Sequence, residues 1–249
     1  MKSCAALAFL SILPLAEARN FTVRNACSFT IWPAIFTDLN VGTAVPSIET
    51  GWEAPPNTSR SFEVPDNWTA GRIWVVFITR RHRMQLIMNG NRVEVIATFR
   101  DWRSPATLAE WTLSGDGNRD FYDVSLVDGY NLPMAITTNS DCPIADCPAD
   151  LASNCPAALT AKNSAGASVG CKTACFANLD GNQANSPNCC SGQFSTPETC
   201  PPSGIQFYDH FKQGCPNSYA YAYDESSNTA LWTCDSTRKV DYTLTFCPS

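Results

Sequence analysis

Cysteine content is the feature that most constrains how this chain folds. The sequence has 13 cysteines, and Cys4 lies in an N-terminal stretch typical of a secretory leader. The remaining even set predicts a disulfide framework in an oxidising compartment: Cys27, Cys142, Cys147, Cys155, Cys171, Cys175, Cys189, Cys190, Cys200, Cys215, Cys234 and Cys247. Spacing alone does not choose a pairing. Cys171 and Cys175 also have a loose metal-ligand spacing, but with 2 histidines and a secretory route we expect no metal site.

The N-terminal stretch indicates secretion. Lys2 gives it a positive start, an apolar run follows, and Ala16-Glu17-Ala18 has the small-x-small pattern of a cleavage site. We therefore expect residues 1–18 to be a signal peptide and the mature protein to be secreted, extracellular or in the cell wall. No other stretch approaches the ~20 apolar residues of a membrane-spanning helix, so no transmembrane segment is expected.

The net charge bears on the class of partner, and N-x-S/T triplets indicate candidate glycosylation sites. The net charge of −6 argues against nucleic acid, whose phosphates need basic surfaces. Asn20, Asn57 and Asn67 each begin an N-x-S/T triplet, and these three asparagines are candidates for glycosylation on a secreted surface.

The fold class follows from short β-type runs. Helical periodicity is scarce, and alternating or β-branched runs recur between Pro, Gly, Asn and Asp. These runs predict strands of an all-β sandwich or barrel: Phe21–Arg24, Thr30–Phe36, Gly71–Ile78, Thr107–Leu113, Phe121–Val127, Tyr219–Tyr223, Ala230–Thr233 and Tyr242–Phe246. Residues 142–215 differ, because they hold nine of the cysteines and few large apolar residues. Such a segment is expected to be a loop-rich insertion held by cross-links.

A second change of composition covers residues 75–103. This segment carries six basic and two acidic side chains, a single Gly, and neither Pro nor Cys. One interpretation is a basic patch for an acidic partner, and the other is an exposed loop or amphipathic hairpin.

Carboxylates are the candidates for chemistry. With His82 and His210 as the two histidines and no G-x-S-x-G motif, nucleophilic catalysis has little support. Each acid on its own is typical of a solvated strand or turn, and catalysis requires two of them to oppose each other across a cleft. An ideal strand places Asp123 and Asp128 on opposite faces, so a bend must intervene if both line one site.

Nine sequence blocks together resemble the thaumatin-like proteins. They occur in the family's order and cover nearly the whole mature chain outside residues 75–103: FTVRNACSFTIWPA, GRIW, PATLAEWTL, DFYDVSLVDGYNLPM, CPADLASNCP, CKTACFAN, CCSG, YAYAYDE and YTLTFCP.

The resemblance implies an all-β fold, a thaumatin-like β-sandwich with an inserted disulfide-rich loop subdomain. The sandwich core is expected at residues 19–146 and 216–249, and the loop subdomain at residues 147–215. It also implies six disulfides, which join Cys27 to Cys247, Cys142 to Cys234, Cys147 to Cys215, Cys155 to Cys171, Cys175 to Cys189 and Cys190 to Cys200.

The family's acidic cleft contains one Arg, one Glu and three Asp. The matching motifs place these residues at Arg72 of GRIW, Glu110 of LAEW, Asp123 of YDVS, Asp128 of VDGY and Asp224 of YAYD. Asp120 is then expected to be a surface acid. For a glycosidase we expect Glu110 to be the acid and Asp128 the nucleophile or base, with the other three residues tuning protonation and holding sugar hydroxyls.

Two functions remain open on this resemblance. One is recognition of β-1,3-glucan of cell walls with weak endo-β-1,3-glucanase activity at most. The other is a non-enzymatic antifungal or defence protein that acts by wall binding or membrane perturbation. An acidic cleft can bind sugar hydroxyls without cutting, so both use the same acids. A cell-wall polysaccharide is the expected partner, with no cofactor and a monomeric chain.

One departure from the family lies at residues 75–103. The family usually has a short loop here with four cysteines in two local bridges, and this segment has none. A shifted reading frame or a misread intron boundary explains the joint loss of both bridges and the change of charge. Genuine replacement by a new hairpin is the alternative, since VVFI and VEVIATF are both strand-forming.

Overall fold

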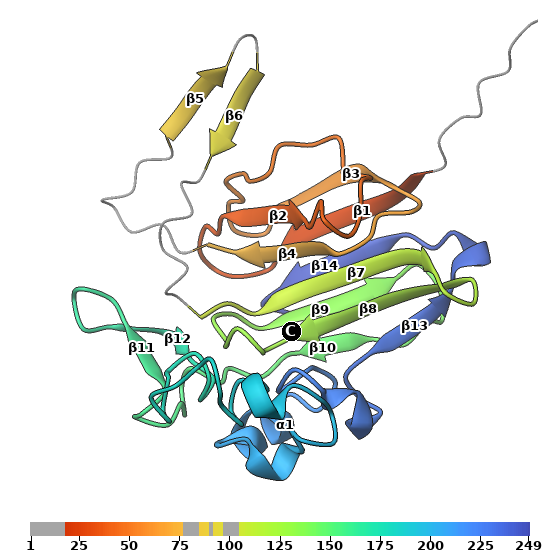
Figure 1. The fold of residues 1–249 in the computed structure, drawn as a ribbon. Coiled ribbons are helices and arrows are strands. Elements are labelled where there is room, and N and C mark those ends of the chain that lie inside the picture. The colour runs from red at the N-terminus through yellow and green to blue at the C-terminus, as the bar shows by residue number, and fades with distance from the viewer. Residues whose placement is uncertain (1–17, 77–84, 90–91, 97–104) are drawn as a thin grey trace, which may run out of the picture.

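Two five-stranded β-sheets form the body of the protein, and a region of loops and short helices lies on one side of them (Figure 1). The structure is a computed structural model that describes residues 18–76, 85–89, 92–96 and 105–249. The all-β prediction is confirmed.

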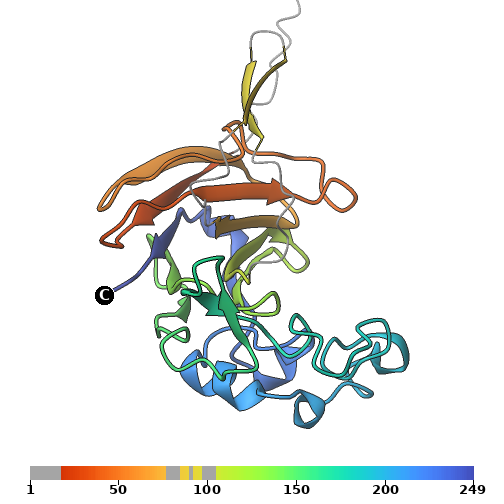
Figure 2. The ribbon, with the colours of Figure 1, turned by 90° about the vertical axis from the view of Figure 1, so that its left-hand side faces the viewer.

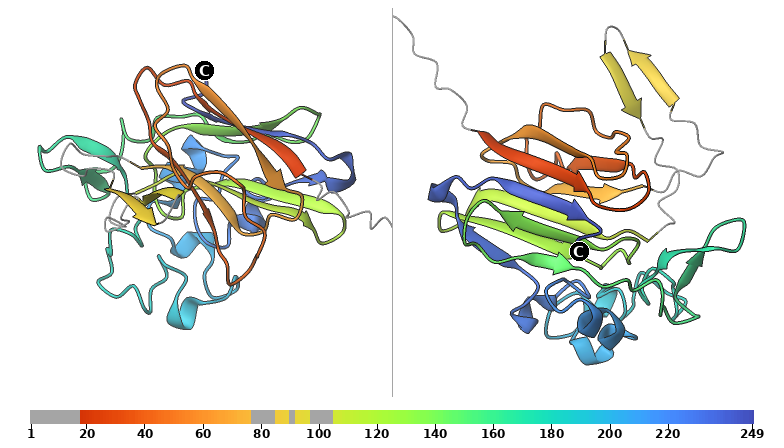
Figure 3. Two further views of the ribbon diagram at one scale, coloured as in Figure 1. Left: turned by 90° about the horizontal axis from the view of Figure 1, so that it is seen from above. Right: turned by 180° about the vertical axis from the view of Figure 1, so that it is seen from behind.

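The first sheet joins the two ends of the described chain. Its order is β10 (Ala145–Cys147), β9 (Met134–Thr138), β14 (Tyr242–Phe246), β1 (Ala18–Asn25) and β3 (Ser59–Pro65). Strands β1 and β14 are parallel neighbours, and the view from behind in Figure 3 shows them side by side.

The second sheet carries the residues of interest for function. Its order is β13 (Trp232–Asp235), β8 (Arg119–Ser125), β7 (Leu108–Gly115), β4 (Gly71–Val75) and β2 (Pro33–Thr37). Every pair of neighbours in this sheet is antiparallel, so residues that face each other across two strands share a face.

Residues 148–231 contain short elements only. They are β11 (Thr160–Lys162), β12 (Ser168–Cys171), α1 (Tyr208–Gly214) and 3₁₀ turns at Gly192–Phe194, Pro202–Gly204 and Asp224–Ser227. Figure 2 shows this region on the side of the molecule opposite to β1 and β3. The described disulfides are the six pairs implied by the family resemblance, from Cys27–Cys247 to Cys190–Cys200.

Aromatic side chains fill the space between the sheets. Strand β1 alternates between exposed and buried residues and turns Phe21 inward. The Phe21 ring centroid lies 5.2 Å from that of Trp111 on β7 and 5.1 Å from that of Tyr242 on β14. Trp68 stacks on Trp111 at 6.0 Å. These rings bury large apolar areas and join the two sheets into one core.

A buried ion pair also joins the sheets, and it corrects one sequence expectation. Asp120, expected to be a surface acid, is fully buried on β8. Arg19 of β1 binds it with two nitrogens, Nη1 at 2.5 Å and Nη2 at 3.1 Å, and the Tyr242 hydroxyl donates to it at 2.9 Å. Burial of this carboxylate is tolerated because a bidentate guanidinium and a hydroxyl replace its water.

Most predicted strands exist, and one does not. The run Tyr242–Phe246 is β14 with the same bounds. The strand predicted at Tyr219–Tyr223 is wrong, because the backbone N–H of Ala220 donates to the Asp224 carboxylate at 2.9 Å and the chain turns there. Strands β3 and β9 and the short strands β10, β11 and β12 were not predicted.

The basic segment 75–103 is described only in part. The structure gives Val75, Val76 and the backbone of an antiparallel pair, β5 (Gln85–Asn89) and β6 (Arg92–Ile96). The other residues of this segment lie outside the described residues. Both alternatives for the segment, a frame error and a genuine hairpin, therefore stay predictions. The sequon residues Asn20, Asn57 and Asn67 are all exposed, and their glycosylation also remains a prediction.

The disulfide between the terminal strands should contribute most to stability. Cys27 and Cys247 are separated by 220 positions, and the Cys142–Cys234 bridge shortens the loop that they close. Replacing both Cys27 and Cys247 by Ala should lower the free energy of unfolding by about 4 to 5 kcal/mol in the chain-entropy model. Urea unfolding measures the loss, after non-reducing peptide mapping has shown six bridges in the parent and the other five in the variant.

The bridge between Cys190 and Cys200 provides the matched control. Its cysteines are only 10 positions apart, so the same double replacement should cost about 3 kcal/mol. A larger loss at this short loop than at Cys27 and Cys247 would contradict the loop-length account.

Candidate functional site

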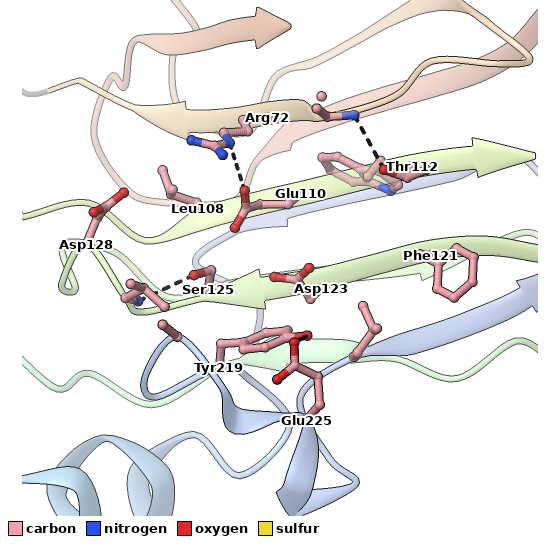
Figure 4. Close-up of a pocket in the computed structure, with 16 residues that line it drawn as sticks. Arg72, Leu108, Glu110, Thr112, Phe121, Asp123, Ser125, Asp128, Tyr219 and Glu225 are labelled. Atoms are coloured by element: carbon pink, nitrogen blue, oxygen red, sulfur yellow. Dashed lines mark hydrogen bonds and ion pairs between the residues drawn. The ribbon is translucent and has the colours of Figure 1, made fainter. Parts of the chain in front are cut away.

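Strand register assembles a row of charged residues on one face of the second sheet. Arg72 of β4 faces Glu110 of β7, and Glu110 faces Asp123 of β8. The alternate residues Ile73 and Ala109 are fully buried in the core. Because successive side chains of a strand point to opposite faces, burying these apolar residues directs the charged ones outward. Figure 4 shows the row on the three adjacent strands.

An ion pair joins the first two members of the row. Arg72 Nε lies 2.8 Å from Glu110 Oε1, and both side chains are partly exposed. Desolvation raises the pKa of the Glu110 carboxyl, with a smaller upward contribution from Asp128, while Arg72 and Ser125 act in the opposite direction. The net result is a carboxyl that holds its proton to a higher pH than an ordinary Glu.

Asp123 is the most buried acid of the row. It is 9% exposed, and its Oδ2 atom has no hydrogen-bond partner among the described residues. Burial raises the pKa of Asp123 well above its ordinary value, Glu110 and Glu225 raise it further, and Arg72 lowers it. Two neighbouring carboxyls that both resist ionisation favour sharing a single negative charge.

A turn brings Asp128 to the same site. Strand β8 ends at Ser125, and Gly129 with φ +93° closes a turn in which its N–H donates to the Leu126 carbonyl at 2.9 Å. The turn supplies the bend that an ideal strand lacks, so Asp123 and Asp128 line one pocket. Desolvation raises the pKa of Asp128, and Arg72 opposes this shift.

The opposite wall comes from the segment after α1. Tyr219 is docked on the end of β8 by two backbone hydrogen bonds of 2.9 Å, from its N–H to Val124 and from the Leu126 N–H to its carbonyl. Its hydroxyl donates to Glu225 Oε1 at 3.1 Å. In Figure 4 Tyr219 and Glu225 lie across from Glu110 and Asp123. Between the two walls lies a cavity of about 430 Å³, a size common for small-ligand sites.

Asp224 does not line this cavity, in contrast to the sequence expectation. It is fully buried behind the wall, where Lys212 Nζ binds it at 3.0 Å and the Tyr208 hydroxyl donates to it at 2.9 Å. Its neighbour Glu225 lines the cavity instead. A 3₁₀ turn begins at Asp224, and adjacent residues of such a turn point in different directions, so Glu225 reaches the cavity while Asp224 points behind the wall.

Sequence reasoning therefore missed Glu225. No local signal distinguishes Glu225 from Asp224, because the ion pair between Lys212 and Asp224 that holds Asp224 behind the wall is a tertiary contact. Of the five residues expected in the cleft, the structure brings together Arg72, Glu110, Asp123 and Asp128.

The site offers proton transfer and polar binding by carboxyl groups. His210 lies beside Cys171, away from the cavity, and His82 is outside the described residues. Within the described ranges, no cluster of three or more His, Cys, Asp or Glu residues is arranged to hold a metal ion. In the same part of the chain, no helix is long and apolar enough to cross a bilayer.

Comparison with a family model and with known proteins finds similarity along nearly the whole chain. The model of the Thaumatin family matches residues 25–248. Thaumatin-like protein 1 of Prunus persica is 38% identical, and the match covers 100% of both chains. A glucan endo-1,3-beta-glucosidase of Prunus avium is 34% identical, again over 100% of both chains.

A solved structure shares the fold at low identity. It is a GH family 64 laminaripentaose-producing beta-1,3-glucanase from Paenibacillus barengoltzii, with a TM-score of 0.56 and 11% identity over 92% of this chain and 74% of that one.

Removing the charge of Asp123 should stabilise the protein at neutral pH. A carboxyl whose pKa is raised by folding stabilises the folded state most at pH values below about 4, its pKa in the unfolded chain. This contribution is lost as the pH rises through the pKa that the carboxyl has in the folded state. The Asp123→Asn variant should therefore gain stability over the parent at pH 7 relative to pH 4, measured by urea unfolding at both pH values. The same replacement at exposed Asp116 is the control. A gain for Asp123→Asn that is equal or larger at pH 4 would refute this account.

The pKa of Glu110 should respond in opposite directions to its two charged neighbours. Replacing Arg72 by Gln removes the cation that lowers the pKa and should raise it, whereas Asp128→Asn removes a repelling charge and should lower it. Carboxyl-carbon NMR titration measures both shifts without requiring activity. Arg72→Lys keeps the charge and should change the pKa least. No movement of the Glu110 pKa in Arg72→Gln would show that the ion pair does not control it.

Proposed function

Because the chain belongs to the thaumatin family, we propose that its acidic pocket binds β-1,3-glucan of cell walls and hydrolyses it weakly at most. The protein is then a secreted defence protein of the extracellular space or cell wall. The single observation that supports this function best is Glu110, a carboxyl with a raised pKa that lines a cavity of about 430 Å³ together with Arg72 and Asp128.

A neutral polysaccharide fits the polar groups of the pocket. Sugar hydroxyls both donate and accept hydrogen bonds, so they match ionised carboxylates, protonated carboxyls and a guanidinium in one site. The pocket also has apolar lining from Leu108, Phe121 and Leu231. The relative from Prunus avium, whose name states activity on a β-1,3-glucan, supports this substrate class for the present chain.

Hydrolysis in this pocket would use two carboxyls. Protonated Glu110 donates its proton to the glycosidic oxygen as the C–O bond breaks, and the ionised Asp128 attacks the anomeric carbon or takes a proton from the attacking water. If Asp128 is the nucleophile, water then cleaves the bond between Asp128 and the sugar, supplies the new hydroxyl and gives its proton to Glu110. If Asp128 is the base, it carries the water proton after the reaction, and exchange with solvent deprotonates Asp128 and reprotonates Glu110. Asp128 contributes to the raised pKa of Glu110 by like-charge repulsion, while Glu225 on the other wall accepts a hydrogen bond from a sugar hydroxyl.

The Arg72–Glu110 ion pair explains why cutting is expected to be weak. Arg72 Nε lies 2.8 Å from Glu110 and lowers its pKa, which reduces the protonated fraction at neutral pH. A smaller protonated fraction leaves less general acid available for catalysis. The same contact favours the second candidate, a defence protein that binds the wall without cutting. Arg72 and the Glu110 oxygens can hydrogen-bond to sugar hydroxyls without any proton transfer.

Replacing Glu110 by Gln separates cutting from binding. The amide keeps the shape but has no proton to donate, so the hydrolysis rate should fall at least about a hundredfold. Affinity for glucan should fall much less, since an amide still donates and accepts hydrogen bonds. Release of reducing ends from soluble β-1,3-glucan measures the rate, and calorimetry measures binding.

The control is Glu63→Gln, at an exposed residue of β3 on the other sheet, which should match the parent. Unchanged turnover in Glu110→Gln would remove Glu110 from the mechanism. Binding by a parent that releases no reducing ends would leave recognition as the function, and a parent that neither binds nor cuts would refute the proposal.

A further inference from the structure

The charged row continues onto the edge strand as an exposed aromatic ring. Phe36 of β2 faces Arg72 of β4, which places Phe36 on the same face as Glu110 and Asp123. Strand β2 is the last strand of this sheet, and Figure 1 shows it beside β4. Phe36 is not part of the cavity lining. It lies one strand beyond the cavity, in line with its charged groups.

The fold places position 36 on the outer face of β2 but does not require an apolar residue there. Its neighbours Ile35 and Thr37 are buried at 5% and 9% exposure and complete the core side of β2, whereas Phe36 is 45% exposed. The next turn adds further exposed apolar side chains, Leu39 at 66% and Val41 at 64%. Ligand sites commonly combine aromatic side chains with a few polar groups, and Phe36 supplies such a ring one strand from the pocket.

The chemistry of the row indicates an uncharged occupant. Arg72 lies between Phe36 and Glu110 in the strand register and pairs with Glu110 at 2.8 Å, so its guanidinium already has a carboxyl partner. A pyranose ring has hydroxyls around its rim and C–H groups on its faces. Its face can cover an aromatic ring while its rim meets charged groups, which a charged or fully apolar ligand cannot do equally well.

We propose that Phe36 is an aromatic subsite that extends the acidic pocket, and that a β-1,3-glucan chain crosses the strands with one glucose stacked on this ring. This inference rests on the glucan-binding function proposed above. Neighbouring strands are about 4.8 Å apart, so Phe36 lies roughly 10 Å from Glu110 along the row. A chain that fills the acidic pocket reaches Phe36 only when it has additional glucose units, and the subsite therefore selects for length.

The test is the dependence of affinity on chain length. Calorimetry would measure the binding of β-1,3-linked glucose oligomers of two to eight units to the full mature protein and to three variants. Phe36→Ala should weaken binding of the longest oligomers about five- to tenfold, the scale expected for burial of one face of an aromatic ring. Binding of the shortest oligomers should not change. Phe36→Tyr keeps the ring and should behave like the parent.

Phe29 provides a matched control. It is also 45% exposed, but it lies in the loop between β1 and β2, outside the strands of the site. Phe29→Ala should leave affinity at every length unchanged. Thermal unfolding of each variant checks that the fold is intact.

The outcomes separate this inference from the proposed function. If Phe36→Ala matches the parent at every length, or weakens all lengths equally, the subsite is refuted while the pocket remains a glucan site. An equal loss in Phe29→Ala would also refute it, because the effect would not be specific to the row. If the parent binds no oligomer of any length, the proposed function fails, and the inference fails with it.

Discussion

The register between β4, β7 and β8 is the constraint on which the site depends. It places Arg72, Glu110 and Asp123 opposite one another, so that residues from three strands share one row. The opposite face of the same strands carries Ile73 and Trp111, which are buried in the core. A slip of one residue would turn these apolar groups to solvent and the charged ones inward, at a high cost in free energy. Core packing therefore also sets the geometry of the pocket.

The second wall of the pocket depends on a different set of constraints. Its segment follows α1 and has no strand of its own, so cross-links and a few polar contacts hold it in place. The Cys147–Cys215 disulfide anchors it four positions before Tyr219, and the backbone of Tyr219 is hydrogen-bonded to the end of β8. Behind this wall Asp224 is held by Lys212 and Tyr208. Because the pocket lies between a rigid sheet and this anchored loop, its acids come from both parts.

Much of this arrangement was predictable from the sequence, and the exceptions have physical reasons. Alternation in TLAEWTL and FYDVSLV correctly indicated strands, because one face of each must be buried. The error at Asp120 arose because a buried carboxylate is identified by its partner, and Arg19 lies about a hundred positions away. Glu225 was missed in favour of Asp224 because which of two adjacent acids faces a cavity depends on tertiary contacts. Local patterns do not contain such long-range pairings.

The central claim is that the row from Arg72 to Asp123, with Asp128 and Glu225, is where a glucan binds. Titrating isotope-labelled protein with a six-unit β-1,3-glucose oligomer and following the backbone amide signals by NMR tests this location directly. The account predicts that the largest changes occur on β4, β7 and β8, in the turn at Asp128 and in the segment from Tyr219 to Glu225. Changes confined to the sheet of β10, β9, β14, β1 and β3, or an absence of changes at saturating oligomer, would contradict it.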